Sequence, residues 1–293
     1  MTVPAAPQGW FEVLLDEDDG DGLRLPEPFR AVYGGDWPLP QGDQYIYVNF
    51  CVARDGRVSF SDPGHLGGGD VSGFDAHDQW LMGLLRARAD AVMMGDGTLA
   101  SEPEHLWTAE FICPTDAEAF AALRRAEGRR PAPLVVFVSL RGDLPWHAAV
   151  FGDPAAEVVI ATTTSGARAV EADSRSVAAS VELLALGDEE VDLRLLAETL
   201  AARFGVERLL CEGGPRLYGS LLRARLQCDE FVTLAPIVLG DDGISGPRRP
   251  SLVEGVRFGV DGAPRSRLLS VRRADDHLFL RCRYAGGGPT PRP

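Results

Sequence analysis

Two glycine-bearing junctions are the parts of this 293-residue sequence best suited to chemistry. In "RLLCEGGPRLYGSLL", an apolar run ends in Glu212, Gly213 and Gly214, and leucines at helical spacing follow. The pattern predicts a strand, a tight turn and a helix start. Because Gly213 and Gly214 have no Cβ, a diphosphate could approach the backbone N–H groups, and the helix dipole would favour its charge. Glu212 would stand at the lip of that site, although a plain turn with a solvated glutamate would give the same pattern.

The second junction is "ADAVMMGDGTLASEP", where Gly95, Gly97 and Ala100 match the G-x-G-x-x-G/A spacing of dinucleotide-binding loops. That motif requires a helix that opens directly from the loop, and we expect Pro103 and its polar neighbours to interrupt any such helix. The remaining prediction is a loop at the carboxyl end of a strand, with backbone N–H groups and the Thr98 hydroxyl offered to a phosphate. The alternative is a tight loop without a ligand.

A third strand end carries clustered hydroxyls and a cation. In "EVVIATTTSGAR", Thr162, Thr163 and Thr164 follow the apolar run, and Arg168 lies one helical turn further on. Hydroxyls and a guanidinium suit an adenosine 2′-phosphate, so this segment favours NADPH over NADH. A threonine-rich helix N-cap explains the same residues equally well.

Near the start of the chain, Asn49 lies within the apolar run "YIYVNFCVA", and Arg57 follows an Asp-Gly turn. A buried amide needs partners, and Arg57 could hold an anionic substrate group; the alternative is an ordinary hairpin turn with a solvated arginine. Ser72 and Asp75 precede a helical pattern in "GGGDVSGFDAHDQWLMGLLRA". Either could face a substrate, but capping the helix is the simpler role.

Composition narrows the class of partner. The net charge of -14 repels nucleic acid and anionic membranes, and no apolar run is long enough to cross a bilayer. We therefore expect a soluble, cytoplasmic protein with a small-molecule substrate. The five histidines are far apart and do not stand in pairs beside cysteines, so the sequence predicts no metal site.

The elements that must position these residues alternate between strands and helices. We expect strands over 45–53, 90–94, 134–139, 158–161, 181–184 and 208–211, and helices over 75–88, 192–204 and 217–226. This order predicts an α/β fold with a mixed, mainly parallel central sheet flanked by helices in three layers. Further strands in the last third would add antiparallel pairs at one edge. We expect an extended leader over 1–42, a single domain over 43–285 and a disordered tail over 286–293.

Taken in order, "NFCVARDGRVS", "LRARADAVMMGDGT", "CEGGPRLYGSLLRA" and "DEFVTLAPIVLG" resemble the reductase domain of bacterial riboflavin biosynthesis. The resemblance covers about residues 45–284. It implies a dihydrofolate-reductase-like fold, NADPH as cofactor and a homodimer. The implied reaction is reduction of a phosphorylated ribosylaminopyrimidine to its ribitylamino product.

The resemblance also implies roles for particular residues. Gly95 to Thr98 and Gly213-Gly214 would lie near the cofactor phosphates, and Glu212 would face the substrate. Asn49 and either Ser72 or Asp75 would contact the substrate or nicotinamide, and Arg57 the substrate phosphate. The family usually has lysine where this chain has Arg57, so a different pterin-like substrate and a dinucleotide-binding protein without catalysis remain open alternatives.

Overall fold

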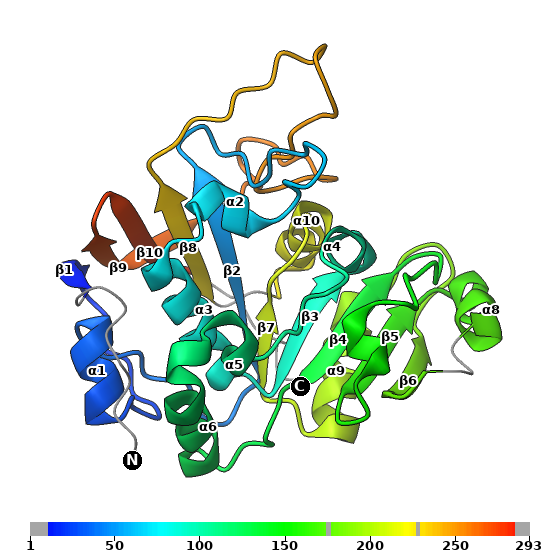
Figure 1. Cartoon of the computed structure of the whole chain (residues 1–293), viewed down its shortest axis with the longest axis horizontal. Coiled ribbons are helices and arrows are strands. Elements are labelled where there is room, and N and C mark those ends of the chain that lie inside the picture. Colours follow the sequence, from blue (N-terminus) through cyan, green and yellow to red (C-terminus); the bar gives the residue numbers. More distant parts are fainter. Residues whose placement is uncertain (1–10, 174–176, 227–228, 285–293) are drawn as a thin grey trace.

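The computed structural model describes residues 11–173, 177–226 and 229–284. Within these ranges ten strands form one sheet: β1 (Glu12–Asp16), β2 (Tyr45–Ala53), β3 (Ala91–Gly95), β4 (Leu134–Ser139), β5 (Glu157–Thr162), β6 (Ser180–Ala185), β7 (Arg208–Cys211), β8 (Asp229–Ala235), β9 (Ser266–Ala274) and β10 (His277–Tyr284). Their order across the sheet is β1-β9-β10-β8-β2-β7-β3-β4-β5-β6 (Figure 1). The seven strands from β8 to β6 are parallel, and β10, β9 and β1 extend one edge with antiparallel pairs.

Helices cover both faces of the sheet (Figure 1). They are α1 (Glu27–Tyr33), α2 (Gly68–Ser72), α3 (Ala76–Ala87), α4 (Asp96–Ser101), α5 (Ala109–Ile112), α6 (Ala117–Ala126), α7 (Ala149–Gly152), α8 (Thr164–Asp173), α9 (Leu193–Phe204) and α10 (Pro215–Ala224). Helices α1, α3 and α6 bury apolar side chains in one core, whereas α9 and α10 pack into a second core on the opposite face. The two cores make the predicted three-layer α/β architecture.

Local sequence explains where the helices that frame the site begin. The Asp75 side chain accepts hydrogen bonds from the backbone N–H groups of His77 and Asp78, which caps α3. Asp192 caps α9 in the same way. Pro215 occupies the first turn of α10, where its missing N–H costs nothing. These starts lie within one or two residues of the predicted ones.

The predicted strands are confirmed, but the direction of β8 was predicted wrongly. Strand β8 runs parallel to β2 because α10 forms a crossover between β7 and β8, which returns the chain to the same edge of the sheet. The strands β9 and β10 are antiparallel, as expected.

The expectation that regular structure begins only after residue 42 was also wrong. Strand β1 pairs with β9 at the sheet edge, and α1 buries Phe29 and Val32 completely in the core. The extended leader was predicted from prolines in this segment, but Pro26 and Pro28 lie at the start of α1, where proline is compatible with a helix. The predicted tail over 286–293 lies outside the described residues.

Candidate active site

A cavity of about 1700 Å³ lies at the carboxyl end of the parallel strands. Its walls come from the ends of β2, β3, β4 and β7, from α3 and from the beginnings of α4, α9 and α10. Open α/β sheets bind ligands at this edge, because the loops that follow neighbouring strands converge there. The volume exceeds the usual range for a single drug-sized ligand, so the cavity has room for a dinucleotide and a second small molecule.

The two glycine junctions meet in this cavity. Gly95, Gly97, Thr98, Gly213 and Gly214 all line it. A Cβ placed on Gly213 would lie 2.6 Å from the Thr98 Oγ1 atom, so only glycine lets the two loops touch. A Cβ on Gly97 would meet no protein atom within 4 Å, so this backbone faces open space that a ligand can approach.

The structure corrects one expectation about the second junction. Helix α4 opens directly from β3, because Gly95 is its N-cap and Asp96 its first residue. Pro103 does not prevent this helix; it follows the end of the helix, after Glu102. The strand, glycine loop and helix are therefore all present, with a helix of six residues.

Glu212 forms a buried ion pair with Arg86 of α3. The Arg86 Nη2 atom lies 2.7 Å from Glu212 Oε2, and Arg86 Nε donates to both carboxylate oxygens at 2.9 and 3.1 Å. The two side chains are 1% and 3% exposed, and both line the cavity. Such a bidentate pair fixes the orientation of the carboxylate and compensates its charge, so a ligand meets a positioned acceptor and not an isolated anion.

Asp78 is a second buried carboxyl group in the cavity wall, and among the described residues no arginine pairs with it as Arg86 pairs with Glu212. It lies on α3 and is 3% exposed. Burial raises the pKa of Asp78 to about 6, although the neighbouring Thr233 and Ser72 hydroxyls partly oppose the shift. The negative charge of Asp75 raises this pKa further, and His277 lowers it. A carboxyl group that titrates near neutral pH in a cavity can serve as a general acid.

Asn49 and Ser72 also line the cavity. Asn49 is 6% exposed, and within the described residues its Oδ1 atom has no hydrogen-bond partner. A buried amide oxygen without a partner is costly unless a ligand or water satisfies it. Ser72 donates to the Gly69 carbonyl at 3.2 Å and can still accept a hydrogen bond.

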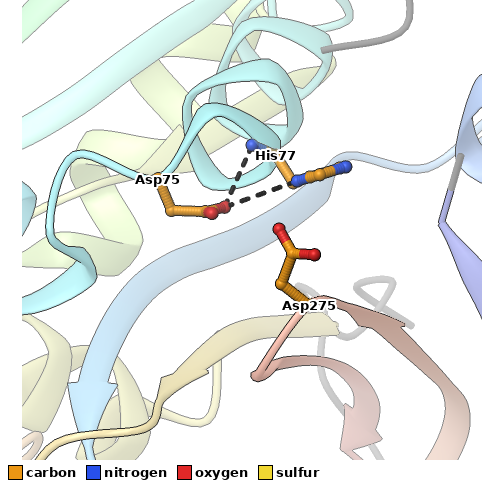
Figure 2. Close-up of side chains that lie close together, drawn as sticks. All are labelled: Asp75, His77 and Asp275. Atoms are coloured by element: carbon orange, nitrogen blue, oxygen red, sulfur yellow. Dashed lines mark hydrogen bonds and ion pairs between the residues drawn. The ribbon is translucent and has the colours of Figure 1, made fainter. Parts of the chain in front are cut away.

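Asp75, the other residue that the sequence offered beside Ser72, does not line the cavity. Its carboxylate caps α3 and lies next to His77 and Asp275 (Figure 2). The simpler role considered for it, capping, is the one that the structure shows.

The threonine cluster and Arg168 lie away from the cavity. Thr163 accepts from the Gly166 backbone N–H at 3.1 Å and donates to the Leu140 carbonyl at 2.8 Å, so it caps the start of α8. Thr162 is fully buried beneath it, and Arg168 is exposed on α8. Arg141, which follows β4, lines the cavity instead.

Arg57 is likewise outside the cavity. Its Nη1 atom donates to the Arg249 carbonyl and lies 3.6 Å from an Asp241 carboxylate oxygen. These contacts tie the turn after β2 to the segment that follows β8. The position gives no support to a role in binding the substrate phosphate.

Asp78, Arg86 and Arg141 line the cavity but were not predicted from the sequence. A signal existed for the first two, because Asp78 lies on the same helical face as Leu81 and Leu85, and Arg86 lies within the buried end of the same helix. A charged residue on an apolar face needs a partner or a function. Arg141 gave no local signal, because only the sheet order brings the end of β4 to the cavity.

Comparison with known proteins identifies the family to which this chain belongs. Residues 44–279 match the family model described as RibD C-terminal domain, so the chain belongs to that family. It is 29% identical over 240 residues to the 2,5-diamino-6-ribosylamino-4(3H)-pyrimidinone 5′-phosphate reductase of Archaeoglobus fulgidus, an alignment that covers 82% of this chain and 98% of that protein. The enzyme of the same name from Methanothermobacter thermautotrophicus is 28% identical over 231 residues, covering 78% and 92%.

Solved structures confirm the fold. A pyrimidine reductase-like protein from Corynebacterium diphtheriae superposes with a TM-score of 0.66 at 18% identity, covering 87% of this chain and 98% of that one. RibD from Acinetobacter baumannii gives a TM-score of 0.59 at 19% identity, covering 84% and 59%. The predicted dihydrofolate-reductase-like fold is therefore confirmed. None of the helices in the described ranges has the length and hydrophobicity that crossing a bilayer demands.

Proposed function

We propose that this protein is an NADPH-dependent reductase that converts a phosphorylated ribosylaminopyrimidine to its ribitylamino product in riboflavin biosynthesis. The observation that carries the proposal is the convergence of two glycine loops and a buried, titratable Asp78 in one cavity of about 1700 Å³. The curated relatives named above are reductases of such a compound. Their alignments span nearly their whole length, which supports the same activity here.

The glycine loops fit the phosphates of a dinucleotide. Gly97 presents its backbone to open space, and its N–H donates to the Asp96 carboxylate at 2.8 Å. Gly213 lets its loop pack against Thr98, which brings the two loops together. We propose that the phosphates lie against the backbone of these loops. We assign the contact with the NADPH 2′-phosphate to Arg141 in place of Arg168. Arg141 lines the cavity and makes no hydrogen bond or ion pair within the described part of the chain. An unpaired guanidinium is available to a 2′-phosphate.

The reaction needs one hydride and one proton. Bound NADPH supplies the hydride, which forms the new C–H bond at the sugar carbon C1′. The bond between C1′ and the ring oxygen O4′ breaks, its electron pair stays on O4′, and that oxygen takes up the proton. We assign the proton to Asp78, the cavity carboxyl group that is partly protonated near neutral pH.

The remaining polar groups position the substrate. The free Asn49 Oδ1 accepts from a donor on the pyrimidine, and Glu212, fixed by Arg86, accepts from another. A pyrimidine that carries amino groups supplies both donors. The protein therefore contributes orientation and a proton, and the cofactor contributes the reducing equivalent.

The test is turnover with the purified protein. NADPH and the phosphorylated ribosylaminopyrimidine are mixed with it, and nicotinamide absorbance is followed with a parallel assay using NADH. We expect substrate-dependent oxidation that is faster with NADPH. Oxidation only with a pterin would reassign the substrate, and tight cofactor binding without oxidation of any candidate would mean a non-catalytic dinucleotide-binding protein.

We further propose, from the family, that the protein acts in the cytoplasm as a homodimer. Light scattering on the eluate of a sizing column tests the assembly, and a monomer at working concentrations would contradict it.

A further inference from the structure

Four side chains of metal-ligand type converge outside the cavity. Asp75 and His77 stand at the start of α3, and Asp275 and His277 stand at the turn between β9 and β10. One ligand atom from each of Asp75, His77 and Asp275 lies within 4.8 Å of the others (Figure 2). The His277 Nδ1 atom lies 3.8 Å from the second Asp75 oxygen. None of the four lines the cavity, so the cluster is a separate feature of the molecule.

The two imidazoles direct unpaired nitrogens at this cluster. The His77 side chain is 4% exposed, and within the described ranges its Nδ1 atom has no hydrogen-bond partner; it lies 3.8 Å from Asp75 Oδ1. His277 Nε2 lies 3.1 Å from the Ser72 carbonyl oxygen, which can only accept, so Nε2 carries the hydrogen. In the neutral ring, His277 Nδ1 then turns a lone pair toward the Asp75 carboxylate. Both 3.8 Å separations are too long for a hydrogen bond, and a cation between the groups would satisfy them.

The surroundings hold these groups ready to bind. Asp75 Oδ1 accepts two backbone hydrogen bonds at 3.0 Å, which fix the carboxylate and leave its second oxygen for another contact. The hydrogen bond from His277 to the Ser72 carbonyl is the type of outer contact that orients metal-binding histidines. Asp275 has a φ of 47°, so a left-handed turn presents its carboxylate to the cluster.

We propose that Asp75, His77, Asp275 and His277 bind one divalent transition-metal ion, with Zn²⁺ the best match. Two imidazoles and two carboxylates suit the tetrahedral coordination of zinc, whereas Mg²⁺ and Ca²⁺ favour all-oxygen sites. Zinc ligands in a tetrahedron stand about 3.4 Å apart. The ligand atoms of Asp75, His77 and Asp275 all lie within 4.8 Å of one another, and His277 Nδ1 lies 3.8 Å from Asp75. Coordination by all four side chains therefore requires the exposed Asp275 turn and the His277 ring to move toward the ion. The ion would cross-link the start of α3 to the β9–β10 turn.

The site lies close to the cavity without being part of it. Asp78, the proposed acid, is the residue after His77 on α3, so the bound ion would fix the helix turn that carries this carboxyl group. The proposal does not depend on the reductase activity, because its test measures metal binding to the free protein.

The experiment uses the full, untagged chain after removal of metals with a chelator. Co²⁺ is titrated while its visible absorption is recorded, since tetrahedral Co²⁺ absorbs strongly, and Zn²⁺ is then added in competition and in thermal melts. We expect one Co²⁺ per chain, displacement by Zn²⁺ and a higher melting temperature with Zn²⁺.

Two variants at the turn make the test specific. Asp275→Asn removes a ligand, and asparagine tolerates the positive φ, so this variant should fold. Asp276→Asn is the matched control, because it removes the same charge one residue away from the cluster. We expect Asp275→Asn to weaken Zn²⁺ binding at least tenfold and Asp276→Asn to leave it unchanged. His277→Gln serves as a second ligand variant. Absence of Co²⁺ uptake by the parent chain, or equal uptake by parent, Asp275→Asn and His277→Gln, would overturn the proposal.

Discussion

Replacing Asp78 by asparagine tests the proposed proton donor. The amide has the same shape and can still donate a hydrogen bond, but it cannot deliver a proton. General acid catalysis commonly contributes about 10²- to 10⁴-fold, so we expect kcat to fall by about that factor. The loss corresponds to about 3 to 5 kcal/mol of transition-state stabilisation.

The pH dependence provides a sharper signature than the rate alone. With a pKa of about 6 for Asp78, about nine-tenths of the acid is protonated at pH 5 and about one-hundredth at pH 8. The parent kcat/KM should therefore fall about 90-fold across this range, and the Asp78→Asn variant should lose this dependence. Asp261→Asn, at an exposed position outside the cavity, is the control and should keep both rate and profile.

Asp78→Asn should lower activity but raise the free energy of unfolding above neutral pH. The folded pKa of Asp78 is raised above the 3.8 of an ordinary aspartate, so the folded state binds this proton more tightly than the unfolded state. The stability gained from the neutral form is complete below about pH 4 and is lost as the pH rises through about 6. The difference of about 2 pKa units is worth about 3 kcal/mol. Asp78→Asn should therefore be the more stable protein at pH 8 in urea denaturation.

These measurements can refute the assignment. If Asp78→Asn retains kcat within twofold, or loses rate but keeps the same descending limb near pH 6, the proton comes from another group. Failure of the parent chain to turn over any substrate would instead count against the proposed function, so the two failures are distinguishable.

Three further predictions concern the cofactor loops and the buried ion pair. Gly213→Ala should lower both the melting temperature and the NADPH affinity, because its Cβ would lie 2.6 Å from the Thr98 hydroxyl. Gly97→Ala should lower the NADPH affinity alone, because its Cβ would meet no protein atom within 4 Å. Equal melting temperatures for the two variants would contradict this prediction. Glu212→Gln should cost about 3 to 5 kcal/mol in urea denaturation, because it leaves a buried guanidinium without its counter-charge, and a loss below 1 kcal/mol would show that the pair is dispensable. Arg141→Ala should narrow the NADPH preference measured as a ratio of affinities for NADPH and NADH, while Arg168→Ala should not; the reverse pattern would restore the sequence-based assignment.

Much of the architecture could be predicted because its signals are local. Apolar runs marked β4 and β7 to the residue, and the capping aspartates marked α3 and α9. Local patterns do not encode which strands become neighbours, so the direction of β8 was missed. The extended leader was predicted wrongly for a similar reason. Strand β1 is stabilised by pairing with β9, more than 250 residues later in the chain, and no local pattern reveals that pairing.

The site was predictable where chemistry is confined to one loop. Both glycine loops were found from their spacing, and they do line one cavity. Neither predicted arginine lines the cavity, because sequence alone does not show which way a guanidinium points: Arg168 is exposed on α8, and Arg57 donates to the Arg249 carbonyl. The proposed metal cluster was not predicted from the sequence, because His77 on α3 and His277 on β10 come together only in the folded protein.

Transfer of a labelled hydride tests the central claim most directly. The protein is incubated with NADPH that carries deuterium at the transferable C4 position and with the phosphorylated ribosylaminopyrimidine, and the product is analysed by mass spectrometry and NMR. We predict one deuterium per ribitylamino product, located at C1′, with one NADPH oxidised for each. An unchanged substrate, or a product without deuterium at C1′, would contradict the account.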